Sequence, residues 1–276
     1  MKISFYLRAC RDVAAMFVTR PVESFRMLRV LPRMVESSQR GRKWPAGTWP
    51  ATTEVIADSR PNPLLDYFQA HAEGPGIWKF PHYFDIYQRH FAKFVGREVH
   101  VVEVGVYSGG SLGMWRSYFG EACHIYGIDI EDSCRVYEDD VTRIFIGDQA
   151  DRAFWDRFRE VVPVVDILID DGGHLAYQQI VTVEEMLAHL QPGGVYLCED
   201  IGGARNDFAA YVCGLALQMN ARTKSHAGHL GPEGINASIH SIHIYPLVAV
   251  IEKALRRVDK MESVRRGTEW QPGPLT

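Results

Sequence analysis

The architecture of this protein can be inferred from one nonapeptide, Asp166-Ile-Leu-Ile-Asp-Asp-Gly-Gly-His174. Its first half is rich in apolar residues, as in a buried strand, and its second half holds two carboxylates, two glycines and an imidazole. Charged side chains are costly to bury unless they are paired or bind a metal. Glycine lets the backbone approach a neighbouring group closely. We therefore interpret the nonapeptide as a buried strand whose end presents chemically active side chains.

Similar apolar segments alternate with helical patterns along most of the chain, which is typical of a doubly wound parallel sheet. Strands are predicted over residues 100–106, 124–130, 143–148, 164–170 and 195–200, with closing strands over 240–245 and 247–251. Helices are predicted over residues 64–68, 83–94, 112–118, 150–160, 175–190 and 208–219. The sequence thus predicts a Rossmann-like, mostly parallel seven-stranded sheet with helices on both faces and a helical N-terminal arm.

The first 60 residues differ from the rest, so a basic helical arm with a linker is expected over residues 1–60 and the sheet domain over residues 61–276. Residues 1–43 carry ten basic and three acidic side chains. Two arm helices are predicted, one around residues 7–17 and one starting at Pro21 that ends or kinks at Pro32. The arm is interpreted either as packing on the core or on a second subunit of a homo-oligomer, or as a peripheral contact with a membrane or polyanion.

Composition excludes several classes of protein. The 276 residues are 46% hydrophobic, which suits a packed core, and the formal charge of −4 gives no reason to expect nucleic-acid binding. The five cysteines are scattered without a Cys-x-x-Cys pair, so a zinc site or a disulfide scaffold is not expected and a cytoplasmic location is. No apolar run reaches the roughly 18 residues of a transmembrane helix, and arginines interrupt any signal-peptide core.

A glycine-rich turn follows the strand over residues 100–106, and an acid ends the next strand, the order used for nucleotide binding in parallel sheets. Glu103, Gly105 and Gly109–Gly110 form the turn, and Asp129 is the acid expected to accept ribose hydroxyls. The glycine spacing departs from Gly-x-Gly-x-x-Gly, which favours a cofactor without a pyrophosphate. Ser111 is interpreted either as a hydrogen-bond partner of the ligand or as the helix cap.

Three segments resemble class I S-adenosylmethionine-dependent methyltransferases: Glu103-Val-Gly-Val-Tyr-Ser-Gly-Gly-Ser111, Tyr126-Gly-Ile-Asp-Ile130 and Gly147-Asp-Gln-Ala-Asp151. The resemblance implies S-adenosylmethionine as the cofactor, with Asp129 on its ribose and Asp148 and Gln149 near its adenine. The cofactor-binding residues expected are Glu103, Gly105, Ser111, Asp129, Asp148, Gln149 and Asp171.

Acidic residues end two neighbouring strands, with Asp170, Asp171 and His174 on one and Glu199 and Asp200 on the other. The carboxyl ends of neighbouring parallel strands border one crevice, so these side chains should meet. Carboxylates gathered in this way repel each other unless a cation lies among them, and oxygen ligands favour Mg²⁺ over Ca²⁺ or Mn²⁺. A metal lowers the pKa of a hydroxyl group, and a nearby neutral imidazole can take its proton.

Ile169-Asp-Asp-Gly-Gly-His174 and Leu190-Gln-Pro-Gly-Gly-Val-Tyr-Leu-Cys-Glu-Asp-Ile201 resemble the macrocin and mycinamicin O-methyltransferase family, whose relatives include proteins labelled cephalosporin hydroxylases. The resemblance covers roughly residues 78–201 and implies methylation of sugar hydroxyls with Mg²⁺. It implies Asp171, Glu199 and Asp200 as metal ligands, His174 as general base, and either a metal contact or only an orienting role for Asp170. The family often has serine where this chain has Gly173, and the segment after Asp200 departs from the macrolide enzymes.

The function expected is a Mg²⁺-dependent O-methyltransferase acting on a sugar hydroxyl of a glycoside or natural product. A nicotinamide-dependent oxidoreductase and a non-catalytic cofactor-binding accessory subunit are the alternatives. Residues of the arm and of 221–240 are expected to line the acceptor pocket, and the identity of the acceptor stays open.

Overall fold

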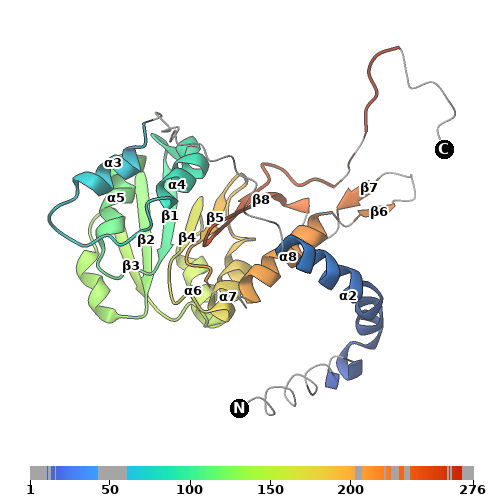
Figure 1. Ribbon diagram of the computed structural model, residues 1–276. Helices are drawn as coiled ribbons and strands as arrows, with labels where there is room; N and C mark the ends of the chain where they lie inside the picture. The colour runs from blue at the N-terminus through green and yellow to red at the C-terminus, as the bar shows by residue number, and fades with distance from the viewer. Residues whose placement is uncertain are drawn as a thin grey trace, which may run out of the picture. The chain divides into compact units, whose positions relative to one another are not determined.

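The computed structural model, drawn as a ribbon in Figure 1, has two compact units, Met1–Arg60 and Pro61–Thr276. It describes residues 11, 14–15, 17–42, 61–202, 207–220, 222–224, 230–232, 237–259, 261 and 263–268. No helix within these ranges has an apolar stretch long enough to cross a membrane.

The first unit contains α2 (Pro21–Arg42), which begins at the proline predicted to start a helix. The helix continues past Pro32, so of the two predicted alternatives, a helix end or a kink at this residue, the end is wrong. A proline removes only one N–H donor, and the remaining hydrogen bonds can carry a helix past it at a cost of about 3 kcal/mol. The helix predicted around residues 7–17 and the linker before residue 61 lie mostly outside the described residues. The contacts expected of the arm stay predictions.

The second unit alternates helices and strands as expected. Its elements before the sheet crossover are α3 (Pro63–Ala70), α4 (Tyr83–Phe91), η2 (Ala92–Phe94), β1 (Val99–Val104), α5 (Gly110–Phe119), β2 (Cys123–Asp129), η3 (Asp132–Tyr137), β3 (Thr142–Ile146) and α6 (Arg152–Val161). The elements after it are β4 (Ile167–Asp170), α7 (Ala176–Met186), β5 (Val195–Cys198), α8 (Asp207–Met219), β6 (Arg222–Lys224), β7 (Leu230–Pro232), β8 (Ile239–Tyr245) and β9 (Val248–Lys253).

Seven strands form one sheet in the order β3-β2-β1-β4-β5-β9-β8. The pairs among β1 to β5 are parallel, whereas β9 runs antiparallel to β5 and β8 antiparallel to β9. The predicted fold class is therefore confirmed. The separate ribbon of β6 and β7 and the short helix η3 have too few residues to show a period in the sequence, and neither was predicted.

Helices cover both faces of the sheet, because successive residues of each central strand are apolar and face opposite sides. On β1, Val101 belongs to the core shared with α3, α4 and α5, and Val102 to the core shared with α6, α7 and α8. Figure 1 shows the two layers of helices flanking the strands. The buried faces leave only the strand ends and loops to carry polar chemistry.

The strand order reverses between β1 and β4, and a crevice lies outside the carboxyl ends of such strands. Gly105 turns the chain at the end of β1 with a φ of 92°, in the left-handed region. A Cβ atom at this position would lie 2.0 Å from the backbone oxygen of Asp171. The backbone of Asp171 is itself held there, because its N–H donates to the carbonyl of Val104 at 3.0 Å. Only glycine allows these two turns to pass each other.

Gly105→Ala should lower the free energy of unfolding by about 3 kcal/mol or more, since it combines a backbone clash with an unfavourable φ. The matched control is Gly214→Ala on α8, where a Cβ meets nothing within 4 Å. That substitution should stabilise the helix by about 0.5–1 kcal/mol. Urea denaturation of both variants checks the comparison, and equal stabilities would contradict the packing described for Gly105.

Candidate active site

A cavity of about 670 Å³ opens at the carboxyl ends of β1, β2, β4 and β5. Its size is within the range of ligand-binding pockets, about 300–1,000 Å³. Nine residues predicted from the sequence line it: Gly105, Ser111, Asp129, Asp148, Gln149, Asp171, His174, Glu199 and Asp200. Glu103 and Asp170, the two remaining candidates, are fully buried and do not line it. The reversal of the sheet thus brings the predicted residues together at one opening.

Asp129 fixes the turn between β1 and α5 from the end of the neighbouring strand. Its Oδ2 accepts hydrogen bonds from the backbone N–H groups of Val106 and Tyr107 at 2.9 and 3.0 Å, and its Oδ1 from that of Glu131 at 2.9 Å. A carboxylate offers about four lone-pair positions, so one remains for a ligand. Asp148 is exposed, and its Oδ1 accepts from the N–H of Ala150 at 2.8 Å. Both acids can therefore face a ligand without losing these bonds.

Ser111 does not cap α5, which settles one of its two interpretations. The N-cap is Gly109, at a φ of 73° and without a side-chain cap bond. The hydroxyl of Ser111 instead donates to Oε2 of the buried Glu103 at 2.7 Å. Burial raises the pKa of Glu103, and its Oε1 has no hydrogen-bond partner among the described residues. Glu103 thus lies behind the cavity wall, whereas its partner Ser111 lines the cavity.

Gln149 and Asp170 form a brace behind the cavity. The amide nitrogen of Gln149 donates to Oδ1 of Asp170 at 2.9 Å, and its oxygen accepts from the N–H of Gly173 at 2.8 Å. The other oxygen of Asp170 accepts from the hydroxyl of Tyr196 at 2.8 Å. Burial raises the pKa of Asp170. Of the two roles proposed for Asp170, the geometry favours the orienting one, because both its oxygens are held away from the cavity.

Lys79 lies among the predicted metal ligands, and the sequence analysis did not single it out. Its Nζ donates to Oδ2 of Asp171 at 2.5 Å and to Oε2 of Glu199 at 3.0 Å, and lies 3.9 Å from Oε1 of Glu103. The side chain is only 3% exposed. Burial alone lowers the pKa of Lys79, but the charges of the three acids outweigh burial and raise it above its ordinary value. The lysine is therefore a cation held by carboxylates at the strand ends.

Glu199 has both carboxylate oxygens occupied. Oε1 accepts from the hydroxyl of Tyr87 at 2.6 Å, and Oε2 accepts from Lys79. Burial raises the pKa of Glu199 even though both donors favour its charged form. As a metal ligand Glu199 would have to release one of these donors, whereas Asp171 and Asp200 would not.

The remaining oxygens form the part of the site that fits a hard cation. Oδ2 of Asp200 lies 3.9 Å from Nε2 of His174, and its Oδ1 accepts from the hydroxyl of Tyr83 at 2.5 Å. Oδ1 of Asp171 and Oδ2 of Asp200 accept no hydrogen bond from the part of the chain that the structure describes. Asp171, His174 and Asp200 each offer one atom that could bind a metal, and these three atoms lie within 4.8 Å of one another. Two free carboxylate oxygens at a solvent-accessible opening suit Mg²⁺, which keeps several positions for other ligands.

Backbone strain is concentrated at this opening. His174 and Asp200 have φ values of 55° and 53°, and Tyr107 has a φ of 48°. All three line the cavity and account for three of the four non-glycine residues with positive φ in the described ranges. Such conformations cost about 1–3 kcal/mol each and persist where the surrounding structure enforces them, often at functional sites.

Helix α4 holds the site from one side through a row of hydrogen bonds. Tyr83, Tyr87 and His90 follow a spacing of four and three residues, which places them on one face of the helix. Each meets a carboxylate, since Tyr83 contacts Asp200, Tyr87 contacts Glu199, and His90 contacts Glu252 with Nδ1 and Oε1 2.6 Å apart. The aromatic face of this segment thus packs in the core and also orients the acids.

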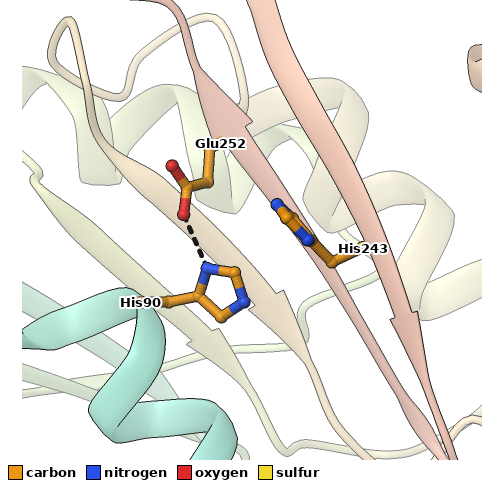
Figure 2. Close-up of side chains that lie close together, drawn as sticks. All are labelled: His90, His243 and Glu252. Carbon is orange, nitrogen blue, oxygen red and sulfur yellow. Dashed lines mark hydrogen bonds and ion pairs between the residues drawn. The ribbon is translucent and has the colours of Figure 1, made fainter.

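Near the C-terminal end of α4, His90 lies close to Glu252 of β9 and His243 of β8, and we call these three residues the clamp (Figure 2). Nε2 of His90 lies 3.0 Å from the hydroxyl of Tyr245, and Lys93 donates to the second oxygen of Glu252 at 3.2 Å. The two histidine rings meet edge to face at 4.7 Å. Because His90 bonds to Glu252 on β9 and to Tyr245 on β8, the clamp ties α4 to the antiparallel edge of the sheet.

Sequence comparison places the chain beside sugar O-methyltransferases. It is 31% identical over 231 residues to 8-demethyl-8-alpha-L-rhamnosyl tetracenomycin-C 2'-O-methyltransferase of Streptomyces olivaceus, covering 76% of this chain and 60% of the relative. It is 32% identical over 197 residues to mycinamicin VI 2''-O-methyltransferase of Micromonospora griseorubida, covering 64% and 48%. Demethylmacrocin O-methyltransferase of Streptomyces fradiae is 35% identical over 163 residues, covering 55% and 40%. The chain spans about half the length of these curated relatives, and no protein-family model matches it.

Structure comparison agrees. The MycE methyltransferase of the mycinamycin biosynthetic pathway, in complex with Mg, SAH and mycinamycin VI, superposes with a TM-score of 0.56 at 29% identity. The match covers 71% of this chain and 54% of MycE.

The seven-stranded sheet has the class I methyltransferase fold, and its cavity lies where the strand order reverses. Within that class, the chain is related to the macrocin and mycinamicin group of sugar O-methyltransferases, so the resemblance inferred from the sequence is confirmed.

Acidification should weaken the clamp. Burial lowers the pKa of His90, and although burial alone raises the pKa of Glu252, the donors His90 and Lys93 lower it below its ordinary value. A group with a depressed pKa binds protons more readily in the unfolded chain, so stability falls as pH drops below 6.5 for the histidine and below 4.5 for the carboxylate. When the pH falls from 7.5 to 5.5, the free energy of unfolding should therefore decrease less in His90→Gln than in the wild type.

Urea denaturation at several pH values measures this difference. His240→Gln, at an exposed histidine of β8 outside the clamp, is the control for the substitution itself. A wild-type pH dependence in His90→Gln would show that the clamp does not titrate as described.

Proposed function

We propose that the protein is an S-adenosylmethionine-dependent, Mg²⁺-dependent O-methyltransferase whose acceptor is a sugar hydroxyl of a glycoside or natural product. The observation that carries the proposal is the meeting of His174, Asp171 and Asp200 at one opening of the cavity that Asp129 and Asp148 also line. Support comes from the relatives, whose names specify 2'-, 2''- or 3'-O-methylation of rhamnosyl tetracenomycins and mycinamicin VI. MycE, a structural relative, is bound to Mg, SAH and mycinamycin VI.

The cofactor end of the cavity is assigned to the turns after β1, β2 and β3. The chemistry that S-adenosylmethionine supplies is a methyl group on a sulfonium. Asp129 has an acceptor position left for ribose hydroxyls, and Asp148 and Gln149 lie on the neighbouring turn, where the adenine is expected. Gly105 and Ser111 also line the cavity, and the hydroxyl of Ser111 donates to the buried Glu103.

The reaction end is assigned to β4 and β5. The chemistry that a divalent ion supplies there is a lower pKa of the acceptor hydroxyl. Asp171 and Asp200 would hold it through their free oxygens, with Glu199 as the third predicted ligand.

His174 is the proposed general base. It is half-exposed at the opening, and its Nε2 would take the proton of the acceptor hydroxyl. The imidazolium that forms is stabilised by the carboxylate of Asp200, which lies 3.9 Å away. The proton then leaves to solvent, so no covalent intermediate with the enzyme is needed.

The acceptor is expected to enter over aromatic side chains. Trp78 is 85% exposed, Phe80 47% and Tyr107 73%, and all three line the cavity. Among the described residues, the cavity lining includes none from the arm or from residues 221–240, where the acceptor pocket was expected. Aromatic rings at an opening suit a ligand with both apolar faces and hydroxyl groups.

The two alternatives have weaker support. The glycine spacing after β1 disfavours a nicotinamide cofactor, and the curated relatives named above are methyltransferases. An accessory subunit without activity would have no need of His174, Asp171 and Asp200 in one place. A homo-oligomer and a peripheral membrane contact through the arm stay predictions.

His174→Ala should lower methyl transfer by about 100-fold or more, because general-base catalysis contributes about 10²–10⁴-fold. S-adenosylhomocysteine binding should stay within about twofold of wild type, since the side chain belongs to the reaction end. Formation of S-adenosylhomocysteine over a panel of rhamnosyl and macrolide glycosides measures the first effect, and calorimetry the second. His124→Ala is the control, and undiminished turnover in His174→Ala would remove the base assignment.

Chelation should stop methyl transfer without unfolding the protein. EDTA is expected to reduce the rate to background, and excess Mg²⁺ is expected to restore it, because hydroxyl groups are poor nucleophiles without a metal. The same assay with and without added metal checks this, with circular dichroism as the control for folding. Full activity in EDTA would contradict a metal role.

A further inference from the structure

The ammonium group of Lys79 lies near three acids, namely Asp171 and Glu199 at the reaction end of the cavity and the buried Glu103 of β1. The ion pairs recorded in the described ranges for Glu103, Asp171 and Glu199 all go to Lys79. Two of these carboxylates are at most 1% exposed and Asp171 is 20% exposed, so water screens their charges poorly. Without the lysine, the acids would be buried with no compensating charge, which is strongly unfavourable.

The position of this ammonium conflicts with that of a metal held by the same acids. Nζ lies 2.5 Å from Asp171 Oδ2 and 3.0 Å from Glu199 Oε2. A divalent ion bound to both oxygens would lie about 2.0–2.6 Å from each, which is nearly the same point in space. Two cations cannot share that position, because their repulsion is large and little screened in a buried site.

We propose that Lys79 is the resident cation of this site and a positioning residue, which holds Asp171 and Glu199 in the metal-free protein and must leave before a divalent ion can bind both. The inference rests on the proposed function, because it concerns the metal predicted there. Lys79 thus competes with the metal, and in the absence of the metal it keeps the metal's ligands in place.

The segment that carries Lys79 also carries two of the aromatic side chains that line the cavity. Trp78 and Phe80 flank the lysine and are exposed at the cavity, while Lys79 points inward. On the N-terminal side the backbone of Pro75 packs tightly against Gly110 of α5, where a Cβ would lie 2.3 Å from the oxygen of Pro75. On the C-terminal side it enters α4 at Tyr83. The ion pairs of Lys79 therefore hold the loop that carries these two aromatic side chains to the acids of β4 and β5.

Lys79→Met tests the competition, because it removes the ammonium and keeps most of the apolar stem. Calorimetric titration with Mn²⁺ as the probe should show binding at least about tenfold tighter than in the wild type, since no charged hydrogen bonds have to be broken. Lys93→Met is the matched control, at a lysine that is 41% exposed and pairs with Glu252 outside the cavity. It should bind Mn²⁺ with wild-type affinity.

A second readout follows thermal stability. In EDTA, Lys79→Met should melt at a lower temperature than the wild type, and saturating Mn²⁺ should restore more of its stability than it adds to the wild type. If Lys79→Met folds poorly without metal, Lys79→Gln provides a neutral side chain that can still donate hydrogen bonds. It is expected to bind Mn²⁺ more tightly than the wild type as well.

The outcomes separate this inference from the proposed function. Equal or weaker Mn²⁺ binding by both Lys79 variants overturns the competition, even if the wild type needs metal for methyl transfer. Tighter binding by the variants supports it, including the case in which the wild type binds too weakly to detect. Absence of binding in all proteins overturns it as well, and methyl transfer in EDTA then decides independently whether the proposed reaction stands.

Discussion

The buried ion pairs of Lys79 with Asp171 and Glu199 are the interaction on which the candidate site depends. When both faces of a parallel sheet are covered, polar groups can reach solvent only at the strand ends. In this protein several acids lie close together at those ends. Their mutual repulsion must be offset by a cation. The lysine supplies that charge from a segment 92 residues earlier in the chain than Asp171, so the loop before α4 is tied to the centre of the sheet.

Helix α4 completes the arrangement, because it bonds three carboxylates along one face. Its tyrosines fix Asp200 and Glu199 from inside the core, and its last turn is clamped to Glu252. The acids are therefore held before any ligand binds, which reduces the cost of organising them later. His174 and Asp200 both have a positive φ, and both line the same opening, where α4 holds Asp200 through Tyr83.

Much of this arrangement could be predicted from the sequence, because near-continuous apolar strands ending in acids determine both the sheet and the edge where the acids meet. Asp171, His174 and Asp200 were found in this way. Lys79 was missed, since its loop has no period and the sequence does not show which cation lies among the acids. The hydroxyl bonds of Tyr83 and Tyr87 were hidden for a different reason: an aromatic helix face predicts core packing and does not reveal where its polar tips point. Glycine was expected at the tight turns, whereas the positive φ of His174 was not predicted, because the sequence carries no signal for it.

The central claim is that the cavity at the strand order reversal binds the methyl donor beside the acids. Calorimetric titration of the full chain with S-adenosylhomocysteine, and separately with NAD, tests it most directly. The structure and its relatives lead us to expect one S-adenosylhomocysteine bound per chain and no heat of binding with NAD. Binding of NAD without binding of S-adenosylhomocysteine would contradict the account.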